Sequence, residues 1–418
     1  MDTARDSGRP LRIIIIGGGI GGLCLAQGLK QVGIEDVAVY ERDQSARGRM
    51  QGYRLRISPD GEQALREVLP PRLQELLSAT SNQRGEEGLA AYDEHLEPKW
   101  APTFSDPRGD SPDKVDAVDR ATLRRILLAG LDDTVRFGKR FTHCEQVGGR
   151  VVAHFDDGDS DVGDVLVAAD GVNSTVRTQL RPADRALDLG VRGVLSRTPR
   201  AQAVAAGLPD AFKDRFVYVI GSDGYHLGLM PMVFREQPDD ASARLWPGLE
   251  FEKTDDYYMS VFSVHQDSLG LSDDTFFAMS GEELKQLVLE RTTNWHPDLR
   301  AVFAHAEPEE THPVALRATS PVEPWEPGNV VPLGDAVHTM PPTGGVGANT
   351  ALRDGAALTR ALTRVSRGEQ SLTDAVTEYQ TEMVKYATEA VDMSLKIAKW
   401  SIQIDVDGGQ TPSSVSSV

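Results

Sequence analysis

One stretch near the N-terminus, LRIIIIGGGIGG at residues 11–22, constrains the fold of this chain more than any other. The apolar run from Leu11 to Ile16 ends abruptly at consecutive glycines, which is typical of a buried strand followed by a tight turn. Apolar residues then recur at helical spacing until Gly33, a typical helix terminator. A second predicted strand, Asp36–Tyr40, ends at Glu41. Strand, turn, helix and strand in this order predict a βαβ unit with a parallel sheet, and hence an α/β fold class.

The glycines of the turn match the pattern G-x-G-x-x-G, with Gly17, Gly19 and Gly22 at its fixed positions. In a dinucleotide site the first glycine permits the turn, the second lets a pyrophosphate approach the backbone, and the third lets the helix pack on the strand. Glu41 is placed to accept hydrogen bonds from ribose hydroxyls and would repel a 2′-phosphate, although Arg42 beside it weakens that exclusion. The stretch therefore predicts FAD or NAD, in preference to a glycine turn that binds nothing.

A second glycine-rich segment, far along the chain, decides between these two ligands. The apolar run VVPL at 330–333 ends at Gly334 and Asp335, and the bend Gly344–Gly347 leads into a helix. Backbone N–H groups at such a helix start bind anionic or polar ligand atoms, and the G-K-[ST] ending of a triphosphate loop is absent. A dinucleotide with a long polyol chain needs this second attachment point. We therefore predict FAD, with its ribityl chain near Asp335 and its isoalloxazine beside Pro341–Asn349.

Composition argues against several classes of protein. A net charge of −19 and the absence of a basic run argue against binding to nucleic acid. No apolar run approaches the ~20 residues that span a bilayer. The two cysteines, Cys24 and Cys144, show no disulfide framework and no metal-ligand spacing, so we expect a cytoplasmic location and no metal. The polar ends, 1–10 and 405–418, are expected to be disordered.

A chain of 418 residues is expected to hold two domains. Short strand-like runs separated by turn residues between about 184 and 310 predict a mainly antiparallel sheet, and the last hundred residues are helical in pattern. Asp119 has the position of an N-cap for the helix that follows it. The predicted parts are a discontinuous FAD-binding domain (11–75, 112–183 and 311–360), a substrate-binding domain (76–111 and 184–310) and C-terminal helices (361–404).

Three patterns, taken in order, resemble a known family. They are Gly17–Gly22 with Glu41, the run VLVAADGVNSTVR at 165–177, and Gly334-Asp335 followed by HTMPPTGGVGAN at 338–349. Together they resemble the class A, single-component FAD-dependent monooxygenases, the aromatic hydroxylases of the p-hydroxybenzoate hydroxylase type. The resemblance covers the flavin half of the chain. It implies a Rossmann-like FAD-binding domain interleaved with a mainly antiparallel substrate domain and followed by a C-terminal helical segment.

The resemblance assigns further residues to the cofactor. It implies that Asp170 serves both FAD and a transient NAD(P)H, and that Arg120 reaches the flavin cofactor. It makes Arg49, Arg54 and Arg56 candidates for contact with FAD or NADPH, whereas solvated charges on an edge strand are the alternative. The full set of candidates is Gly17, Gly19, Gly22, Glu41, Arg42, Arg49, Arg54, Arg56, Arg120, Asp170, Asp335, Gly347, Ala348 and Asn349.

The resemblance also implies the reaction. NAD(P)H reduces FAD, the reduced flavin meets O2, and a flavin C4a-hydroperoxide delivers one oxygen atom to a phenolic, aromatic or polyketide-type small molecule. A base or cation near the substrate oxygen would assist, and Arg215, Tyr225 and His226 are the candidates. Alternation along a strand would direct Tyr225 and His226 to opposite faces, so at most one of them faces the pocket. An ordinary core or surface role is the competing interpretation of all three.

Several alternatives stay open at this point. The same fold could perform Baeyer–Villiger insertion, epoxidation or plain reduction on a secondary metabolite, or the chain could be a non-enzymatic dinucleotide-binding protein. A flavin halogenase is disfavoured because W-x-W-x-I-P is absent. The sequence names no substrate and does not decide between NADPH and NADH or between monomer and homodimer. Asp354-Gly355 stands where the family usually has Asp-Ala, which predicts altered helix packing, and His338 is expected to have a structural part beside the FAD pyrophosphate.

Overall fold

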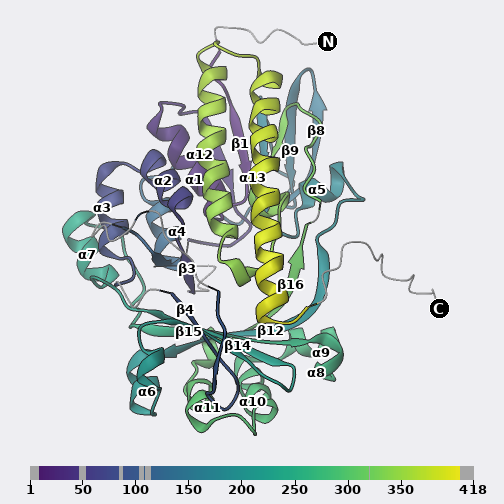
Figure 1. The fold of residues 1–418 in the computed structure, drawn as a ribbon. Helices are drawn as coiled ribbons and strands as arrows, with labels where there is room; N and C mark the ends of the chain where they lie inside the picture. The colour runs from purple at the N-terminus through teal and green to yellow at the C-terminus, as the bar shows by residue number, and fades with distance from the viewer. Residues whose placement is uncertain are drawn as a thin grey trace.

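A computed structural model shows a mixed α/β protein in two halves (Figure 1). In the upper half the long helices α12 (Gly347–Ser366) and α13 (Leu372–Ser401) lie side by side against a parallel sheet. The lower half is built on a wide sheet with helices beneath it. The predicted fold class is therefore confirmed. The structure describes residues 9–46, 53–83, 88–102, 108, 114–319 and 321–404.

Two sequence predictions concern residues outside the described part of the chain. They are the cofactor candidate Arg49 and the C-terminal tail 405–418. The expected N-terminal tail is described only from Arg9, which forms an ion pair with Asp164. Arg9, two residues before the expected end of disorder at Leu11, is therefore held against the fold.

β1 (Ile13–Ile16) lies at the centre of the five-stranded sheet of the upper half. It pairs in parallel with β2 (Val37–Tyr40) and β11 (Val165–Ala168), and all four of its residues are buried, which explains its uninterrupted apolar sequence. β17 (Val330–Pro332) and β7 (Val135–Arg136) complete the order β17-β11-β1-β2-β7. The carboxyl ends of parallel strands share one edge, so the three motif segments meet there.

α1 (Ile20–Gln31) and α12 cross at close range because small residues face each other. A Cβ atom added at Gly355 would lie 2.9 Å from the Cys24 sulfur, and one added at Gly28 would lie 2.3 Å from the Thr359 hydroxyl oxygen. Glycine at position 355 therefore permits this approach. The other helices of this half are α2 (Pro59–Val68), α3 (Pro71–Ala79), α4 (Arg120–Leu128) and α5 (Thr175–Leu180).

The lower half contains a seven-stranded sheet in the order β16-β12-β15-β14-β13-β4-β5. Its central strands pair antiparallel, as predicted, while β13 and β4 pair in parallel. β16 (His312–Ala318) belongs to this sheet although the sequence analysis placed it with the FAD-binding segments. The other strands are β12 (Leu187–Pro199), β15 (Tyr257–His265), β14 (Tyr225–Met232), β13 (Phe216–Ile220), β4 (Leu89–Tyr92) and β5 (Pro98–Lys99).

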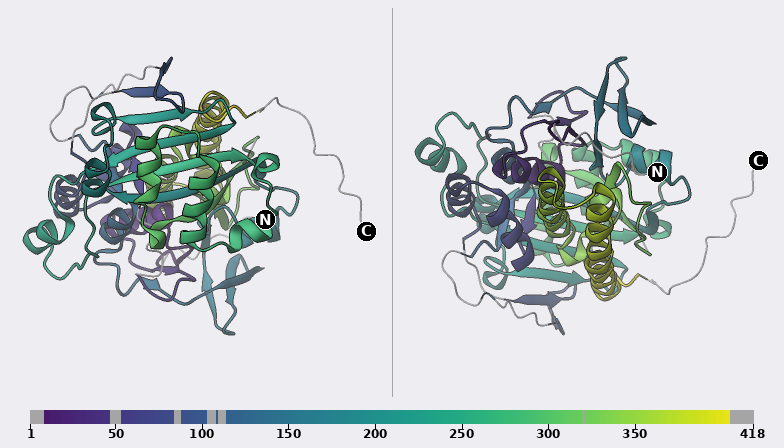
Figure 2. Two further views of the ribbon diagram at one scale, coloured as in Figure 1. Left: turned by 90° about the horizontal axis from the view of Figure 1, so that it is seen from below. Right: turned by 90° about the horizontal axis from the view of Figure 1, so that it is seen from above.

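Helices cover one face of this sheet, as the view from below shows (Figure 2). α10 (Gly281–Arg291) and α11 (Pro297–Ala304) lie across the strands, and Phe303 meets Phe262 edge-on with 6.1 Å between ring centroids. Sequence analysis predicted only strands in this region. The remaining short helices are α6 (Arg200–Ala205), α7 (Pro238–Leu245), α8 (Gln266–Leu269), α9 (Asp273–Ala278), and the 3-10 turns η1 (Asp210–Phe212), η2 (Pro308–Glu310), η3 (Gly334–Ala336) and η4 (Pro342–Gly344).

α13 connects the two halves. It starts beside α12 in the upper half, and near its end Ala398 and Ile402 pack against Val191 and Leu316 of the lower sheet. α12 itself continues across residue 360. The predicted boundary between the FAD-binding segments and the C-terminal helices therefore lies inside a helix.

Two small sheets complete the fold. Asp119 ends the shorter one and caps α4 as predicted, because its carboxylate accepts a hydrogen bond of 2.8 Å from the Thr122 N–H. The shorter sheet pairs β3 (Arg54–Arg56) with β6 (Ala117–Asp119), and the longer pairs β8 (Phe141–Val147), β9 (Arg150–Phe155) and β10 (Ser160–Gly163).

None of the helices in the described part of the chain has both the length and the apolar composition to cross a bilayer.

Candidate active site

A cavity of about 410 Å³ lies between the two halves. The glycine turn after β1, the loops after β11 and β17, the strand β3 and the lower sheet all border it. This volume is within the range of small-molecule sites. Residues of all three motif segments share the cavity, and among the cofactor candidates those that line it are Gly17, Gly19, Gly22, Glu41, Arg42, Arg54, Arg56, Arg120, Asp170, Asp335, Gly347 and Ala348.

The turn between β1 and α1 has the geometry of a phosphate site. Gly17 has φ 111°, and a Cβ atom there would lie 2.2 Å from the Ala169 carbonyl oxygen, so only glycine fits. Gly19 begins α1 without a side-chain cap, and a Cβ atom added to it would meet nothing within 4 Å. The N–H groups of the first turn of α1 therefore border open cavity and are free for an anionic ligand.

Glu41 is held firmly at the end of β2. Its Oε2 accepts a hydrogen bond of 2.8 Å from the Gly18 N–H, and its Oε1 accepts one of 3.0 Å from the Asp43 N–H. Carboxylate oxygens keep further lone pairs that ribose hydroxyls can use. Arg124, which sequence analysis missed, is buried behind the turn and donates to the carbonyl oxygens of Gly18 at 3.0 Å and Ala46 at 2.8 Å. Its position on an otherwise ordinary amphipathic helix gave no signal.

A second uncapped helix start reaches the cavity at α12. Its N-cap residue, Val346, offers no side-chain hydrogen bond, and Gly345 before it has φ 61°, which favours glycine. Gly347 and Ala348 line the cavity at this helix start. The backbone of the predicted flavin loop therefore presents N–H groups to the cavity, as the turn before α1 does.

Asn349, also a cofactor candidate, uses its side chain within the protein. Its Oδ1 accepts a hydrogen bond of 2.8 Å from the Ser58 N–H, and its Nδ2 donates to the carbonyl oxygens of Arg56 at 2.8 Å and Gly345 at 2.9 Å. The side chain is buried and does not line the cavity. Asn349 thus fixes the end of β3 against the start of α12.

Charged groups with free hydrogen-bonding atoms face the cavity. Enclosure of Asp335 raises the pKa of its carboxyl group, although His338 and Arg120 oppose that shift. The Arg120 guanidinium lies over the Tyr53 ring at 5.3 Å, and burial lowers the pKa of Arg54 to about 10. Among the described residues, Nη1 of Arg120 and Nε of Arg54 have no hydrogen-bond partner. Such atoms are normally satisfied, so the cavity has the donors and acceptors for a polar ligand.

Asp170 ends β11 at the same edge. Its Oδ2 accepts hydrogen bonds from the N–H groups of Thr175 at 2.7 Å and Val176 at 3.2 Å. Burial raises the pKa of Asp170, although a hydrogen bond from Ser174 opposes the shift. Its Oδ1 is buried and has no hydrogen-bond partner among the described residues.

A buried network fixes the loop after β17 from behind. Asp354 Oδ2 accepts a hydrogen bond of 2.8 Å from the Gly334 N–H and lies 2.6 Å from His338 Nε2, while its Oδ1 accepts one of 2.6 Å from the Tyr386 hydroxyl. Burial opposes a charge on His338, but the Asp354 carboxylate raises the pKa of His338 above its usual value. His338 does not line the cavity. The network holds Gly334, and with it the backbone of Asp335.

The lower sheet forms the other end of the cavity. His226 of β14 is 2% exposed, and its Nδ1 has no hydrogen-bond partner among the described residues. Burial lowers the pKa of His226 to about 4, so the imidazole is neutral at physiological pH. The Tyr218 hydroxyl donates a hydrogen bond of 3.0 Å to the Thr343 carbonyl, which ties this wall to the flavin loop. The wall around His226 is largely apolar and includes Phe216, Tyr218, Leu227, Met230, Met259, Val261 and Leu316.

The other two substrate-side candidates lie away from the cavity. Tyr225 is directed to the opposite face of β14, as strand alternation requires, and stacks on Phe262 at 5.5 Å in the helix-covered core. Arg215 immediately precedes β13 and is not part of the cavity lining. Of the three candidates, only His226 is placed to contact a molecule in the cavity.

The end of α13 borders the cavity as well, which sequence analysis missed. Ser401 and Ile402 line it, and Trp400 meets Tyr218 edge-on with 5.3 Å between ring centroids. The sequence pattern there is that of an ordinary amphipathic helix. Only the packing of α13 against a strand nearly two hundred residues earlier reveals its part in the site.

Two family models match the segments that build this cavity. An NAD(P)-binding Rossmann-like domain matches residues 15–72, and an FAD binding domain matches residues 248–394. A solved structure from Photorhabdus luminescens, assigned as an FAD containing monooxygenase, is 30% identical with a TM-score of 0.78, over 95% of this chain and 100% of that one. The chain belongs to the FAD-dependent monooxygenase family. The two uncapped helix starts, the carboxylates of Glu41 and Asp335 and the free donors of Arg120 fit FAD, the family's cofactor.

Two relatives of this monooxygenase family show the range of proteins with a similar chain. A dual O-methyltransferase/FAD-dependent monooxygenase of Cercospora beticola is 31% identical over 401 residues, which cover 91% of this chain and 45% of that protein. The chain thus spans less than half the length of that relative. A 6-hydroxynicotinate 3-monooxygenase of Pseudomonas fluorescens is 29% identical over 374 residues, which cover 88% of this chain and 86% of that protein.

Proposed function

We propose that this protein is an FAD-dependent, NAD(P)H-consuming monooxygenase that inserts one oxygen atom of O2 into an aromatic small molecule of phenolic or polyketide type. One observation carries the proposal. A single cavity has glycine turns and carboxylates at one end and an apolar wall with a buried neutral histidine at the other. An aromatic substrate is supported by this wall and by the relative named a 6-hydroxynicotinate 3-monooxygenase.

The cofactor supplies the redox chemistry, because bound FAD takes electrons from NAD(P)H and activates O2 for transfer of one oxygen atom, the other leaving as water. The chain binds the cofactor, orients the substrate and encloses the reaction site. The starts of α1 and α12 offer N–H groups and the positive ends of their dipoles, while Glu41 and Asp335 accept hydrogen bonds from hydroxyl groups. The lower sheet and the end of α13 hold the substrate and exclude water.

His226 is the substrate-binding residue in this proposal. A phenolic hydroxyl can donate a hydrogen bond to the neutral imidazole of His226, which lines the cavity. With its pKa lowered to about 4, His226 is a weak base at neutral pH. It therefore orients the hydroxyl and does not remove its proton completely.

The cofactor part of the proposal is tested by visible absorption and by titration with FAD. We expect flavin absorption bands in the purified protein. Glu41→Gln should weaken FAD binding about tenfold, because it removes one charge-assisted acceptor. Glu35→Gln, at an exposed position two residues before the start of β2, is the control and should bind FAD as the parent does. A colourless protein that takes up no added FAD would refute the proposal.

The reaction is tested by oxidation of NADPH and of NADH under air with a panel of phenols and aromatic polyketides. We expect one compound to stimulate oxidation and to gain one atom of labelled oxygen from ¹⁸O2, whose position separates hydroxylation from insertion or epoxidation. His226→Phe should lower kcat/KM about 10- to 100-fold, mainly through KM. Tyr225→Phe, one residue along but facing away, should leave it unchanged. FAD binding without oxidation of either nicotinamide would contradict the proposal.

A further inference from the structure

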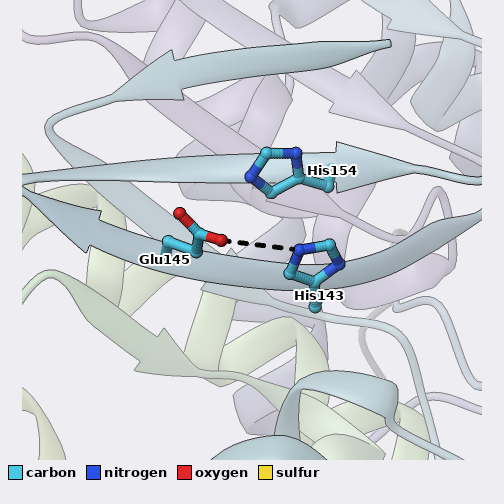
Figure 3. Close-up of side chains that lie close together, drawn as sticks. All are labelled: His143, Glu145 and His154. Carbon is cyan, nitrogen blue, oxygen red and sulfur yellow. Dashed lines mark ion pairs between the residues drawn. The ribbon is translucent and has the colours of Figure 1, made fainter. Parts of the chain in front are cut away.

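The longer of the two small sheets carries a cluster of metal-binding side chains outside the cavity (Figure 3). His143 and Glu145 come from β8, and His154 comes from the neighbouring strand β9. One possible ligand atom from each side chain lies within 4.8 Å of the other two. None of the three lines the cavity, and the proposed reaction does not use them.

Strand register brings these residues to one face. His143 lies directly opposite His154 in the antiparallel pair, and Glu145 follows two residues after His143, so all three side chains point the same way. The alternate residues Cys144 and Ala153 point inward and are buried. A register shift just before His143 sets this alignment. The imidazole rings stack with 4.4 Å between centroids and 8° between planes.

Thr142 lies beside the Nδ1 edge of His143. Its hydroxyl oxygen is 3.0 Å from His143 Nδ1 and 3.1 Å from the His154 carbonyl oxygen, to which the hydroxyl can donate its proton. In that arrangement the hydroxyl accepts from an Nδ1–H group, and Nε2 keeps a lone pair for a ligand. A metal-binding histidine is held in the same way, with its other ring nitrogen donating to a fixed acceptor.

Nε2 of His143 lies 3.8 Å from Oε1 of Glu145, a separation at which one cation can contact both atoms. Nε2 of His154 has no hydrogen-bond partner among the described residues. The three side chains thus offer ligand atoms close together that the protein itself does not fully use.

We propose that His143, Glu145 and His154 bind one divalent transition-metal ion of the zinc type. Two imidazoles and one carboxylate are a common zinc ligand set, with the fourth position left to water. Bonds of about 2.1 Å in a tetrahedron place ligand atoms about 3.4 Å apart. The exposed side chains of His143 and Glu145 and the half-buried ring of His154 reach that spacing by small rotations about their terminal torsions, which have broad minima. The ion clamps β8 to β9, whose hairpin begins at the cavity residue Phe141.

The test is a calorimetric titration of zinc chloride into the untagged, FAD-loaded protein at neutral pH, with metal analysis after dialysis. We expect one zinc ion per chain. His143→Ala and His154→Ala should each weaken binding at least about tenfold, and Glu145→Gln, which keeps the shape and removes the charge, should weaken it too. Should His154→Ala fail to fold, the exposed positions His143 and Glu145 still decide the outcome.

A matched control guards against binding to the acidic surface of a chain with net charge −19. His95 is exposed, and its Nε2 lies 3.8 Å from Glu94 Oε1, the separation found between His143 and Glu145, but no second imidazole joins that pair in the described part of the chain. His95→Ala should leave zinc binding unchanged. Equal affinity in all variants, or no one-to-one binding in the parent, would overturn the proposal.

Discussion

Replacing Gly19 by alanine should weaken FAD binding without weakening the fold. Its backbone, with φ −80° and ψ −177°, is open to any residue, and an added Cβ atom would meet no protein atom within 4 Å. The new methyl group would instead occupy the cavity at the uncapped start of α1, where a pyrophosphate must approach the backbone. Overpacking of this kind costs about 1–3 kcal/mol. At about 1.4 kcal/mol per tenfold, FAD should bind about 5- to 140-fold more weakly.

The same substitution at Gly22 should act on the fold instead. A Cβ atom there would lie 2.2 Å from the Gly17 carbonyl oxygen and 3.3 Å from a methyl group of Ile15, so α1 must move away from β1. We expect Gly22→Ala to lower the free energy of unfolding of the apoprotein by about 1–3 kcal/mol or more. Each variant adds one methyl group, and the two positions are three residues apart. The methyl group of Gly19→Ala lies in the cavity, whereas that of Gly22→Ala lies in the core.

Two assays separate these effects. Urea unfolding of the FAD-free proteins measures the fold, and quenching of flavin fluorescence on titration measures the affinity for FAD. Gly19→Ala should have the parental free energy of unfolding in urea but a lower affinity for FAD than the parent. The reasoning is refuted if Gly19→Ala binds FAD with parental affinity, or if it loses stability as Gly22→Ala does.

Three further substitutions test the interior. Tyr386→Phe removes the hydroxyl that donates to Asp354, so urea unfolding should show a loss of about 1.5–3 kcal/mol; an unchanged midpoint would mean that the bond contributes nothing. Gly355→Ala should cost about 1–3 kcal/mol through its contact with Cys24, and adding Cys24→Ala should recover part of that loss in a double-mutant cycle, whereas strict additivity would argue against the contact. The pKa of His226 is lowered to about 4 in the folded protein and lies below its unfolded value of about 6.5. Above about pH 6.5 the imidazole is neutral in both states, so its full contribution to stability is present. As pH falls from about 6.5 to about 4, up to about 3 kcal/mol should be lost, and His226→Leu should remove this dependence from pH-resolved unfolding curves.

The cofactor end of the site could be predicted because its signals are local. β1 and the turn after it are encoded within about ten consecutive residues, and the turn works through backbone N–H groups that glycine leaves accessible. Glu41 could be placed by its distance along one βαβ unit, and Asp119 by the helix that it caps. In each case a few adjacent residues fix the position of the functional atom, so no knowledge of distant packing is needed.

The substrate end could be predicted only in part because its contacts are long-range. Alternation along β14 limited the pocket to one of Tyr225 and His226 but could not say which, since that depends on which face of the sheet the helices cover. The sequence of β16 has the pattern of an ordinary short strand, and only its pairing with β12 assigns it to the lower sheet. The same holds for Ile402, which reaches the cavity from the far end of α13.

The proposed metal cluster shows the same limit at a smaller scale. The sequence analysis expected no metal from the spacing of the two cysteines, and His143 and His154, eleven positions apart, match no metal motif. Their alignment depends on a two-residue turn and on a register shift near Phe141, and a slip of one residue would send the rings to opposite faces. Chemistry carried by backbone and short motifs can thus be read along this chain. Chemistry carried by side chains that meet across strands cannot, which is why the cofactor is better defined here than the substrate.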